Sequence, residues 1–438
     1  MYDLCFWINQ DEPFTHLYGL KPNSSFNFNT PSNIECHSYF LELFCLYGKE
    51  YKVKFINIDK VDLNDINICL IPAQSLPNIQ TYKSGEITDA VMLSKNIISW
   101  CYDNEIKVII DRSRERCIWD IVERLKYLDD HQLINFNYFR VLVDHPLEIT
   151  DDIYEKLIIH ADLFFWEMGG LLHNYINSSK IENLNLSASS HSNKKYTFSA
   201  LMGEIRKPHR LYLRTQLHTD GMLDNAFWST VNRYADNHVN GAYSYEHKRY
   251  IYTYGKEMYK TMIQEKRFDN TNRTSRGKIV PLNNATDRVI PPEFYQCNFN
   301  IPFESSIKSY FYTEKTYKPI ATKQPFLIFG KNGINSFLTS KEFQIFSEIF
   351  DYDSIEYEDI FDFDDNNPEK SYLAMKFESD QIYVKKFRDE VRRVIQEPDS
   401  IWTQKSVINK CEYNISSLKK RTTKEKFDDF IIKVFDTW

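Results

Sequence analysis

Residues 303–330 read FESSIKSYFYTEKTYKPIATKQPFLIFG and decide the fold of the second half of this 438-residue chain. The apolar-alternating run Asn298–Phe303 leads into this stretch and predicts a strand. Thr313 is a typical helix N-cap, and Glu314 follows in the first turn, where a carboxylate suits the helix dipole. The apolar run Phe326–Phe329 then predicts a buried strand. The expected order is therefore strand, loop, helix, strand.

Charged and hydroxyl side chains gather where these elements meet. Glu304 and Ser305 stand at the end of the first strand. Lys315 and Lys318 are three residues apart, so they share one helix face and can reach the same anion. The backbone N–H groups at a helix N-terminus attract anions as well. The segment therefore suits an anionic nucleotide ligand. The alternative interpretation is an ordinary solvated helix face that carries Glu314 and the two lysines.

The pattern Glu-Ser, Thr-Glu-Lys, Lys-Pro-Ile and Pro-Phe resembles the donor-binding motif of α-1,3-fucosyltransferases. It is even more similar to the fucosyltransferase-related glycosyltransferases of phage, giant-virus and bacterial surface-sugar gene sets. In such enzymes a glutamate and a lysine of the motif contact the ribose and the diphosphate of the sugar nucleotide. The resemblance implies these roles for Glu304, Glu314 and Lys315.

The segment that begins at residue 196 predicts a further strand, turn and helix. Tyr196–Met202 is strand-like, Gly203 suits a turn, and Pro208 suits the first position of a helix that reaches His218. This segment resembles the second-domain opening of the same glycosyltransferases. Basic residues crowd the turn and could bind a diphosphate, or could form a common surface turn. They are Arg206, Lys207, His209 and Arg210.

Two tyrosines, Tyr312 and Tyr317, flank the Thr-Glu-Lys motif. Each could stack on the base of the nucleotide, and core packing is an equally good interpretation of both.

The first 170 residues alternate strand and helix signals, which predicts an open, mostly parallel α/β sheet. The strand-like runs are Lys52–Ile58, Ile66–Ile71, Lys107–Asp111, Phe139–Asp144 and Asp162–Trp166. Helical periodicity marks Glu86–Tyr102, Ser113–Tyr127 and Asp151–His160.

An inverting transfer must take a proton from the acceptor, so a general base is expected in the first domain. Asp111 ends the Lys107 strand, and Glu115 lies four residues on, one turn into the next helix. Both could therefore face a cleft. Asp144 and Glu167 are alternatives at other strand ends. Carboxylates in such places often only cap the following helix, and this interpretation stays open for each of them.

Composition excludes several classes of protein. The net charge of −7 disfavours an avid non-specific nucleic-acid binder. The eight cysteines form no CxxC and no zinc pattern, so they are expected to be reduced residues of a cytoplasmic protein. No signal peptide and no apolar run near the roughly 20 residues of a membrane span is present. No metal or other cofactor is expected, because arginine and lysine can neutralise a diphosphate.

The sequence thus predicts an α/β chain with two Rossmann-like domains facing across a cleft, which is a GT-B-like arrangement, and C-terminal helices. Residues 1–190 would bind the acceptor, 191–395 the nucleotide sugar, and 396–438 would pack back on the domain junction. The resemblance implies an inverting, metal-independent glycosyltransferase that uses a nucleotide-sugar donor and a hydroxyl acceptor such as a glycan. It favours a GDP-sugar only weakly, because the motif contacts mainly ribose and phosphates.

Two rival functions stay open. A phage-type DNA glycosyltransferase that modifies hydroxymethylated bases would share the donor site and would need a basic channel in the first domain. The cluster Arg112, Arg114 and Arg116 is compatible with such a channel, but the net charge does not favour it. A non-catalytic nucleotide-sugar or glycan-binding module would bind a nucleotide sugar without turnover.

Overall fold

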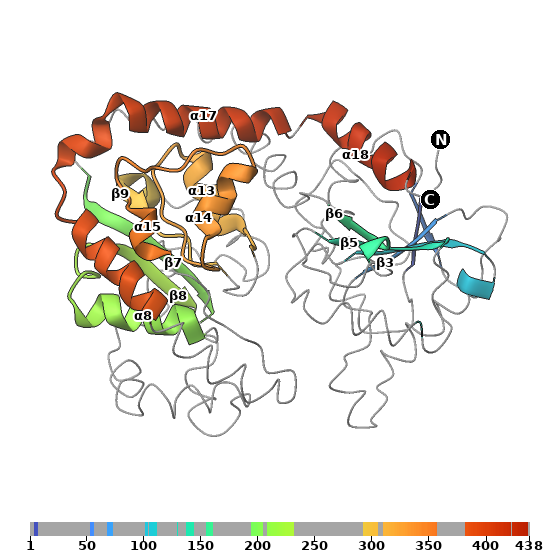
Figure 1. Ribbon diagram of the computed structural model, residues 1–438, viewed down its shortest axis with the longest axis horizontal. Helices are drawn as coiled ribbons and strands as arrows, with labels where there is room; N and C mark the ends of the chain where they lie inside the picture. The colour runs from blue at the N-terminus through green and yellow to red at the C-terminus, as the bar shows by residue number, and fades with distance from the viewer. Residues whose placement is uncertain are drawn as a thin grey trace, which may run out of the picture. The chain divides into compact units, whose positions relative to one another are not determined.

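The chain forms two compact units in a computed structural model (Figure 1). Unit 1 comprises Met1–Ser178 and Leu418–Trp438, and unit 2 comprises Ser179–Ser417. The described residues are 4–7, 53–56, 68–72, 101–103, 105–111, 129, 137–143, 155–160, 194–204, 208–231, 292–304, 310–356, 382–421 and 423–436. The expected domain boundary near residue 190 and the expected packing of 396–438 on a domain junction stay predictions.

Unit 1 contains a parallel sheet whose described strands follow the order β2-β1-β3-β4-β5-β6. They are β1 (Leu4–Trp7), β2 (Val53–Ile56), β3 (Ile68–Pro72), β4 (Lys107–Asp111), β5 (Phe139–Val143) and β6 (Ile158–His160). Strands that are buried on both faces read as continuous apolar runs. Val108 to Ile110 in β4 and Val141 to Val143 in β5 fit this rule, since each is at most 3% exposed. The predicted parallel α/β sheet is confirmed for this unit.

The strand order of unit 1 reverses at β1, because β2 lies on one side of it and β3 on the other. Ligands of open α/β sheets bind outside the carboxyl ends of the strands at such a reversal. The two strands that flank this reversal, β1 and β3, end at Trp7 and Pro72. Asp111, the last residue of β4, pairs in register with Pro72. Asp111 therefore ends the strand next to β3, one strand away from the reversal.

Two short strands of unit 1 depart from the sequence-based prediction. No sequence pattern singles out β1, although it lies inside the sheet. The predicted helix Asp151–His160 is wrong at its end, where β6 pairs with β5. The β-branched residues Ile158 and Ile159 favour an extended backbone, and Ile159 is 4% exposed. The predicted elements Ser113–Tyr127 and Asp162–Trp166, with most of Glu86–Tyr102, lie outside the described residues.

Unit 2 contains a second parallel sheet, with the described strands in the order β8-β7-β9. These strands are β7 (Tyr196–Glu204), β8 (Phe227–Val231) and β9 (Cys297–Asn300). Two parallel bridges extend the pairing from the end of β9. They join Asn300 to Phe326 and Phe303 to Phe329. The expected strand Asn298–Phe303 thus appears as β9 and its continuation. The expected strand Phe326–Phe329 is present as two bridges in a segment that is at most 1% exposed.

Gly203 lies inside β7, so the turn predicted at this glycine is wrong. The pairing register between β7 and β8 shifts between Leu201 and Glu204. A glycine inside a strand often marks such an irregularity. The predicted helix after this strand is confirmed as α8 (Pro208–Thr219).

Aromatic rings fill the core of unit 2. Phe299 in β9 is fully buried and contacts Phe198 and Phe350. Trp402, in the 3-10 helix η9 (Asp399–Thr403), stacks on Phe299 with ring centroids 5.3 Å apart and an interplanar angle of 8°. Part of the high aromatic content of the sequence therefore serves packing beneath the sheet.

The remaining described helices complete unit 2 and add one helix to unit 1. They are η8 (Pro292–Gln296), α13 (Glu314–Ala321), α14 (Ile334–Ser340), α15 (Tyr352–Ile355), a helix over 382–394, α17 (Lys405–Arg421) and α18 (Lys424–Asp436). The helical C-terminal part predicted from the sequence is confirmed within the described residues. None of the described helices has both the length and the apolar character needed to cross a membrane.

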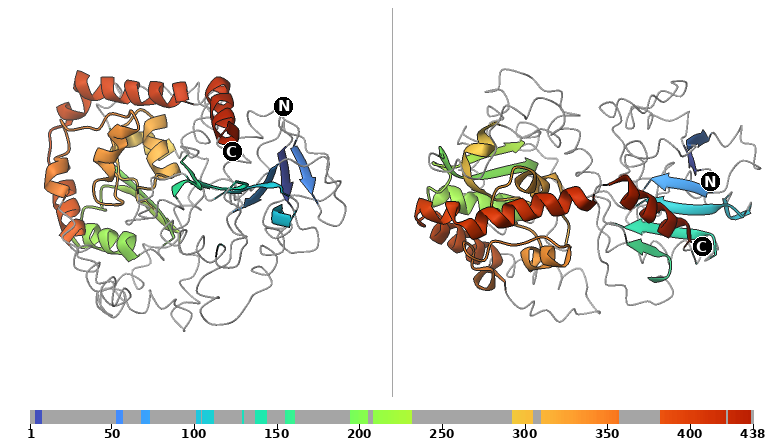
Figure 2. Two further views of the ribbon diagram at one scale, coloured as in Figure 1. Left: turned by 45° about the vertical axis from the view of Figure 1, so that its right-hand side comes forward. Right: turned by 90° about the horizontal axis from the view of Figure 1, so that it is seen from above.

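The long helix α17 runs along the side of unit 2 that carries α13 and α14 (Figures 1 and 2). Asn414 fixes it there, since its amide accepts from the Gln344 N–H at 2.7 Å and donates to the Gln344 carbonyl at 2.9 Å. The Ser417 hydroxyl donates to the Glu342 carbonyl at 3.0 Å. At this contact the Asn414 side-chain amide therefore pairs with the Gln344 backbone N–H and carbonyl.

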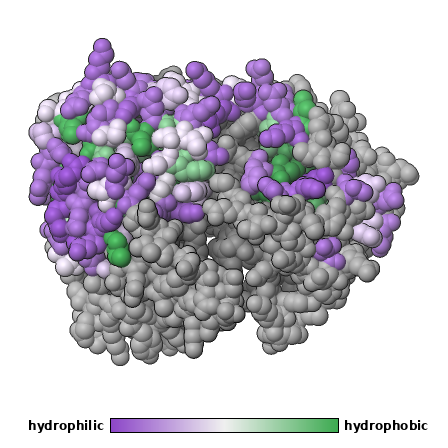
Figure 3. Space-filling model, viewed as in Figure 1, coloured by the Kyte–Doolittle hydropathy of each residue, from purple (hydrophilic) through white to green (hydrophobic). Residues whose placement is uncertain are grey.

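The helix over 382–394 packs beside α8 through charged side chains. Arg388 donates to the Gln216 amide oxygen at 2.9 Å and lies 3.5 Å from Asp220. Arg392 pairs with Asp220 and, at 3.0 Å, with Asp389. Figure 3 shows mainly hydrophilic residues over the described part of unit 2 on this face. These pairs are partly solvent-exposed, so each contributes little stability on its own.

Candidate functional site

The two segments that carry the motif residues meet at one edge of the sheet in unit 2. β7 and β9 are neighbours in the sheet, and the strand order reverses at β7, with β8 on its other side. The chain leaves β7 toward α8 and leaves β9 toward Glu304. The Arg210 Nε of α8 donates to the Glu304 carbonyl at 2.9 Å. The two segments therefore lie at the ends of neighbouring strands of one sheet.

Glu304 is fully buried and joins several elements at this edge. Its Oε1 atom accepts from the Thr313 backbone N–H at 3.0 Å and from the Thr316 hydroxyl at 2.6 Å. Its own backbone N–H donates to the Phe329 carbonyl at 2.8 Å. A carboxylate at a helix N-terminus is stabilised by the helix dipole. The Glu304 carboxylate therefore binds the start of α13 rather than facing solvent.

Thr313 caps α13 as the sequence predicts. Its backbone is extended, with φ −126° and ψ −176°, and its hydroxyl accepts from the Lys315 N–H at 3.4 Å. The Lys315 ammonium donates to the same hydroxyl at 3.2 Å. Lys315 is half-buried. Its hydrogen bond to the Thr313 hydroxyl holds the ammonium near the start of the helix. Glu314 is the first residue of α13, and its side chain lies outside the described part of the structure.

Lys318 differs from Lys315 in its exposure, although both are on α13. Lys318 is 7% exposed, so the alternative interpretation of a solvated helix face is wrong for this residue. Pro319 follows it inside the helix and removes one backbone donor. The Thr322 hydroxyl donates to the Lys318 carbonyl at 2.9 Å and closes the last turn.

The tyrosines that flank the motif belong to the core in this structure. Tyr312 and Tyr317 are 4% and 6% exposed. The Tyr312 hydroxyl donates to the Ile334 carbonyl at 2.8 Å, and its ring is nearly parallel to that of Phe337. The sequence leaves both base stacking and core packing open for these tyrosines. In this structure both residues pack in the core.

The basic residues after β7 are placed only in part. Arg210 is 4% exposed and its guanidinium reaches the Glu304 carbonyl. His209 lies in α8, but its side chain is outside the described part. Arg206 and Lys207 lie outside the described residues altogether. Arg210, whose side chain is described, therefore reaches the motif, and the roles of the other three stay predictions.

Arg214 is a buried cation that no sequence motif singles out. It is fully buried on α8, four residues after Arg210, and its guanidinium carbon lies 4.3 Å from the centroid of the Trp228 ring. Desolvation lowers the pKa of Arg214 well below its ordinary value. The spacing of four residues between the two arginines was the available signal, because it places both on one helix face.

A chain of buried polar side chains lies beneath the same sheet edge. The Ser199 hydroxyl in β7 donates to the Asn300 amide oxygen, and the Asn300 amide nitrogen donates to Gln324 at 2.6 Å. Gln324 in turn donates to the Phe294 carbonyl at 3.0 Å. Buried polar groups that are satisfied in this way fix a unique arrangement. Asn300, a polar residue in the apolar run that forms β9, was the sequence signal for it.

The side chains of the four candidate general bases lie outside the part of the chain that the structure describes. Asp111 ends β4 on the carboxyl edge of the sheet in unit 1, and its side chain lies outside the described part. The other three candidates, Glu115, Asp144 and Glu167, lie outside the described residues. Their roles stay predictions.

Within the described ranges, no three His, Cys, Asp or Glu side chains are grouped as metal ligands would be. The expectation that the chain needs no metal stays a prediction.

Neither a protein-family model nor a curated protein sequence matches this chain. Among solved structures, the chain is similar to the crystal structure of an alpha1,3-fucosyltransferase. The TM-score is 0.36 and the identity 12%, with 91% of each chain covered. At this identity and TM-score the likeness establishes neither a shared fold nor a shared activity.

Proposed function

We propose that this protein is a glycosyltransferase that transfers a sugar from a nucleotide-sugar donor to a hydroxyl acceptor such as a glycan. The observation that carries the proposal is the hydrogen bond from Arg210 to the Glu304 carbonyl. It joins the two motif segments at a reversal of strand order, where open α/β sheets bind their ligands. The sequence resemblance to fucosyltransferase-related enzymes supports the same reaction and a GT-B-like pair of Rossmann-like domains.

The donor diphosphate would bind at the N-terminus of α13 in unit 2. Backbone N–H groups of the first turn and the half-buried Lys315 ammonium suit its charge. Arg210, which reaches the Glu304 carbonyl, and the buried Lys318 of α13 would add positive charge. Glu314, at the first helical position, would take the ribose hydroxyls, as the resemblance implies. Tyr312 would support the site by packing.

The reaction would be a single displacement with inversion. The acceptor oxygen forms a bond to the anomeric carbon while the bond from that carbon to the diphosphate oxygen breaks. The acceptor proton passes to a carboxylate of unit 1, for which Asp111 and Glu115 are the first candidates. The nucleoside diphosphate leaves with the bonding electrons, and Lys315 with the helix dipole stabilises its charge. No metal is required for this charge balance.

A thermal-shift screen against a panel of UDP-, GDP-, CMP- and dTDP-sugars tests the proposal. A ligand at 100 times its dissociation constant should stabilise the protein by about 2.7 kcal/mol. Turnover of the stabilising donor with glycan acceptors then separates an enzyme from a binding module, which would bind without turnover. If no nucleotide sugar binds, the proposal fails.

Lys315→Ala is expected to weaken binding of the nucleotide sugar while the fold stays intact. Loss of one charge-assisted phosphate contact costs about 1.5–3 kcal/mol, or roughly a 10- to 150-fold higher Kd. Isothermal titration of both variants with the donor found in the screen measures this change. Lys410→Ala is the matched control, because Lys410 is also half-buried but pairs with Glu348 at 2.6 Å. Equal Kd values for wild type and Lys315→Ala would contradict the assignment.

Asp111→Asn and Glu115→Gln are expected to separate a general base from a helix cap. The true base should lose about 100-fold in turnover with donor affinity unchanged, because proton transfer acts only in the transition state. A carboxylate that only caps the helix should instead cost about 1 kcal/mol of stability and little turnover. Normal turnover in both variants would move the role to Asp144 or Glu167.

A further inference from the structure

The main chain and side chain of Glu304 connect four parts of unit 2. The carboxylate binds the start of α13, the backbone carbonyl accepts from Arg210 of α8, and the backbone N–H donates to Phe329. The residue itself continues the chain that leaves β9. The Glu304 side chain is fully buried, and its Oε1 atom is engaged by the start of α13. The contact role that the family resemblance implies for Glu304 stays a prediction, and these contacts point to a positioning role.

The carboxylate is held by a short chain of hydrogen bonds that ends at Lys315. The Thr316 hydroxyl donates to Glu304 Oε1 at 2.6 Å, and the same oxygen accepts from the Thr313 N–H at 3.0 Å. The Thr313 hydroxyl then accepts from both the backbone N–H and the ammonium of Lys315. Thr313 and Thr316 are at most 1% exposed. Hydrogen bonds between buried groups are stronger than those in water, because the local dielectric constant is low.

We propose that Thr316 and Glu304 are positioning residues that set the first turn of α13 and the Lys315 ammonium for the donor diphosphate. The assignment rests on the proposed function, because it gives Lys315 a phosphate to bind. Thr316 orients the Glu304 carboxylate, the carboxylate orients the Thr313 amide, and Thr313 orients Lys315. Neither positioning residue touches the donor. Thr316 is not assigned any role by the motif resemblance.

Three variants of α13 test this chain of contacts from Thr316 through Glu304 and Thr313 to Lys315, which we call the relay. Thr316→Val removes the hydroxyl and keeps the shape of the side chain, and Thr316→Ser restores the hydroxyl. Thr322→Val is the matched control, because Thr322 is 3% exposed and its hydroxyl donates at the other end of α13. If Thr316→Val does not fold, Thr316→Ala removes the same hydroxyl without a branched side chain.

The first readout is hydrogen exchange in the ligand-free protein, which does not depend on any donor. Thr316→Val should speed exchange of the amides at 313–317 by about 10-fold or more, since a buried hydrogen bond to a carboxylate is lost. Thr316→Ser should exchange like the wild type. Thr322→Val should speed exchange only after residue 318. Equal exchange at 313–317 in wild type and Thr316→Val would overturn the relay.

The second readout is the Kd for GDP and UDP together with the steady-state constants of the donor. Thr316→Val should raise the Kd and the donor KM by about 10- to 30-fold with kcat changed less, because binding is weakened before the transition state. Thr316→Ser and Thr322→Val should stay within about threefold of the wild type, the spread expected when no contact changes.

The two readouts separate failure of the proposal from failure of the function. If the wild type binds a nucleotide and Thr316→Val binds it equally well, the positioning role is overturned while the glycosyltransferase proposal stands. If Thr322→Val weakens binding as much as Thr316→Val, general loosening of α13 explains both, and the relay is again overturned. If the wild type binds no nucleotide, the glycosyltransferase proposal fails. The proposal that the relay positions Lys315 for a donor diphosphate then fails too, whatever hydrogen exchange shows at 313–317.

Discussion

Trp402→Ala is expected to lower the free energy of unfolding of unit 2 by about 3–5 kcal/mol, the range typical of a buried tryptophan replaced by alanine. Trp402 is 2% exposed and stacks on Phe299 at 5.3 Å. Phe299 is fully buried against Phe198 and Phe350, so the cavity would open in the centre of the aromatic core. Phe198 and Phe299 belong to the paired strands β7 and β9, so they cannot move far into that space.

Hydrogen exchange of the β7 and β9 amides in increasing urea measures the opening free energy of this unit without relying on tryptophan fluorescence. Tyr413→Ala is the control, because Tyr413 is 45% exposed on α17 and should change stability by about 0.5 kcal/mol or less. A loss below about 1.5 kcal/mol in Trp402→Ala would show that the stack does not support the sheet.

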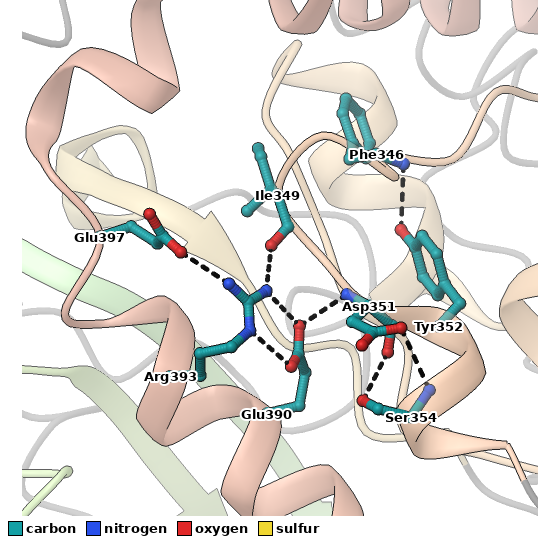
Figure 4. A network of polar contacts seen from close by, with 8 residues as sticks. All are labelled: Phe346, Ile349, Asp351, Tyr352, Ser354, Glu390, Arg393 and Glu397. Carbon is teal, nitrogen blue, oxygen red and sulfur yellow. Dashed lines mark hydrogen bonds and ion pairs between the residues drawn. The ribbon is translucent and has the colours of Figure 1, made fainter.

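Arg393→Met is expected to destabilise unit 2 by about 2–4 kcal/mol, because it strands a buried carboxylate. Figure 4 shows the contacts that would be lost. Arg393 Nε donates to Glu390 Oε2 at 2.9 Å and its Nη2 donates to Glu390 Oε1 at 2.7 Å. The Glu390 side chain is 2% exposed, so water cannot replace the guanidinium. The Asp351 N–H, at 2.7 Å, would remain as a donor to this carboxylate.

The same guanidinium also binds the Ile349 carbonyl and, at 2.6 Å, Glu397. The hydrogen bond to Glu390 is the main reason that the pKa of Arg393 is raised, which agrees with a tightly bound cation. Methionine keeps an unbranched apolar stem like that of arginine and removes all of these donors. The helix over 382–394 would then lose its main polar tie to the 349–351 segment.

Arg392→Met provides a matched control for this prediction. Arg392 and Arg393 have side chains that are 42% and 44% exposed, but Arg392 pairs with the more exposed residues Asp220 and Asp389. Exposed pairs contribute about 1 kcal/mol at most. Urea unfolding followed by hydrogen exchange should therefore separate the two variants clearly. Equal losses in both would mean that the burial of Glu390 does not decide the cost.

Local sequence signals predicted the elements that local chemistry controls. β4 (Lys107–Asp111) has the predicted bounds, because its apolar run is bounded by charged residues at both ends. The start of α13 was predicted from Thr313, whose hydroxyl needs only the next turn as a partner. The helix after β7 was predicted from Pro208, which is already suited to a first helical turn.

Elements whose partners are distant in sequence could not be predicted in the same way. β1 is a strand of four residues, and its pairing with Val53 and Ile68 leaves no trace in its own pattern. The burial of Glu304 depends on Thr316 and Phe329, which are folded against it from other elements. A glutamate at a strand end reads as exposed until those partners are known, so the positioning role that we propose for Glu304 is not visible in the motif.

The pairing of β7 with β9 also has a consequence for how the chain folds. Ser199 and Asn300, which are hydrogen-bonded across this pair, are 101 positions apart, and Arg210 and Glu304 are 94 positions apart. Contacts of such high sequence separation require closure of a long loop, whose entropy must be lost before the contacts form. The first turn of α13, where we propose that the donor binds, would therefore be completed late in folding. A ligand bound there would stabilise the closed sheet, and it would have nothing to bind in the chain that precedes closure.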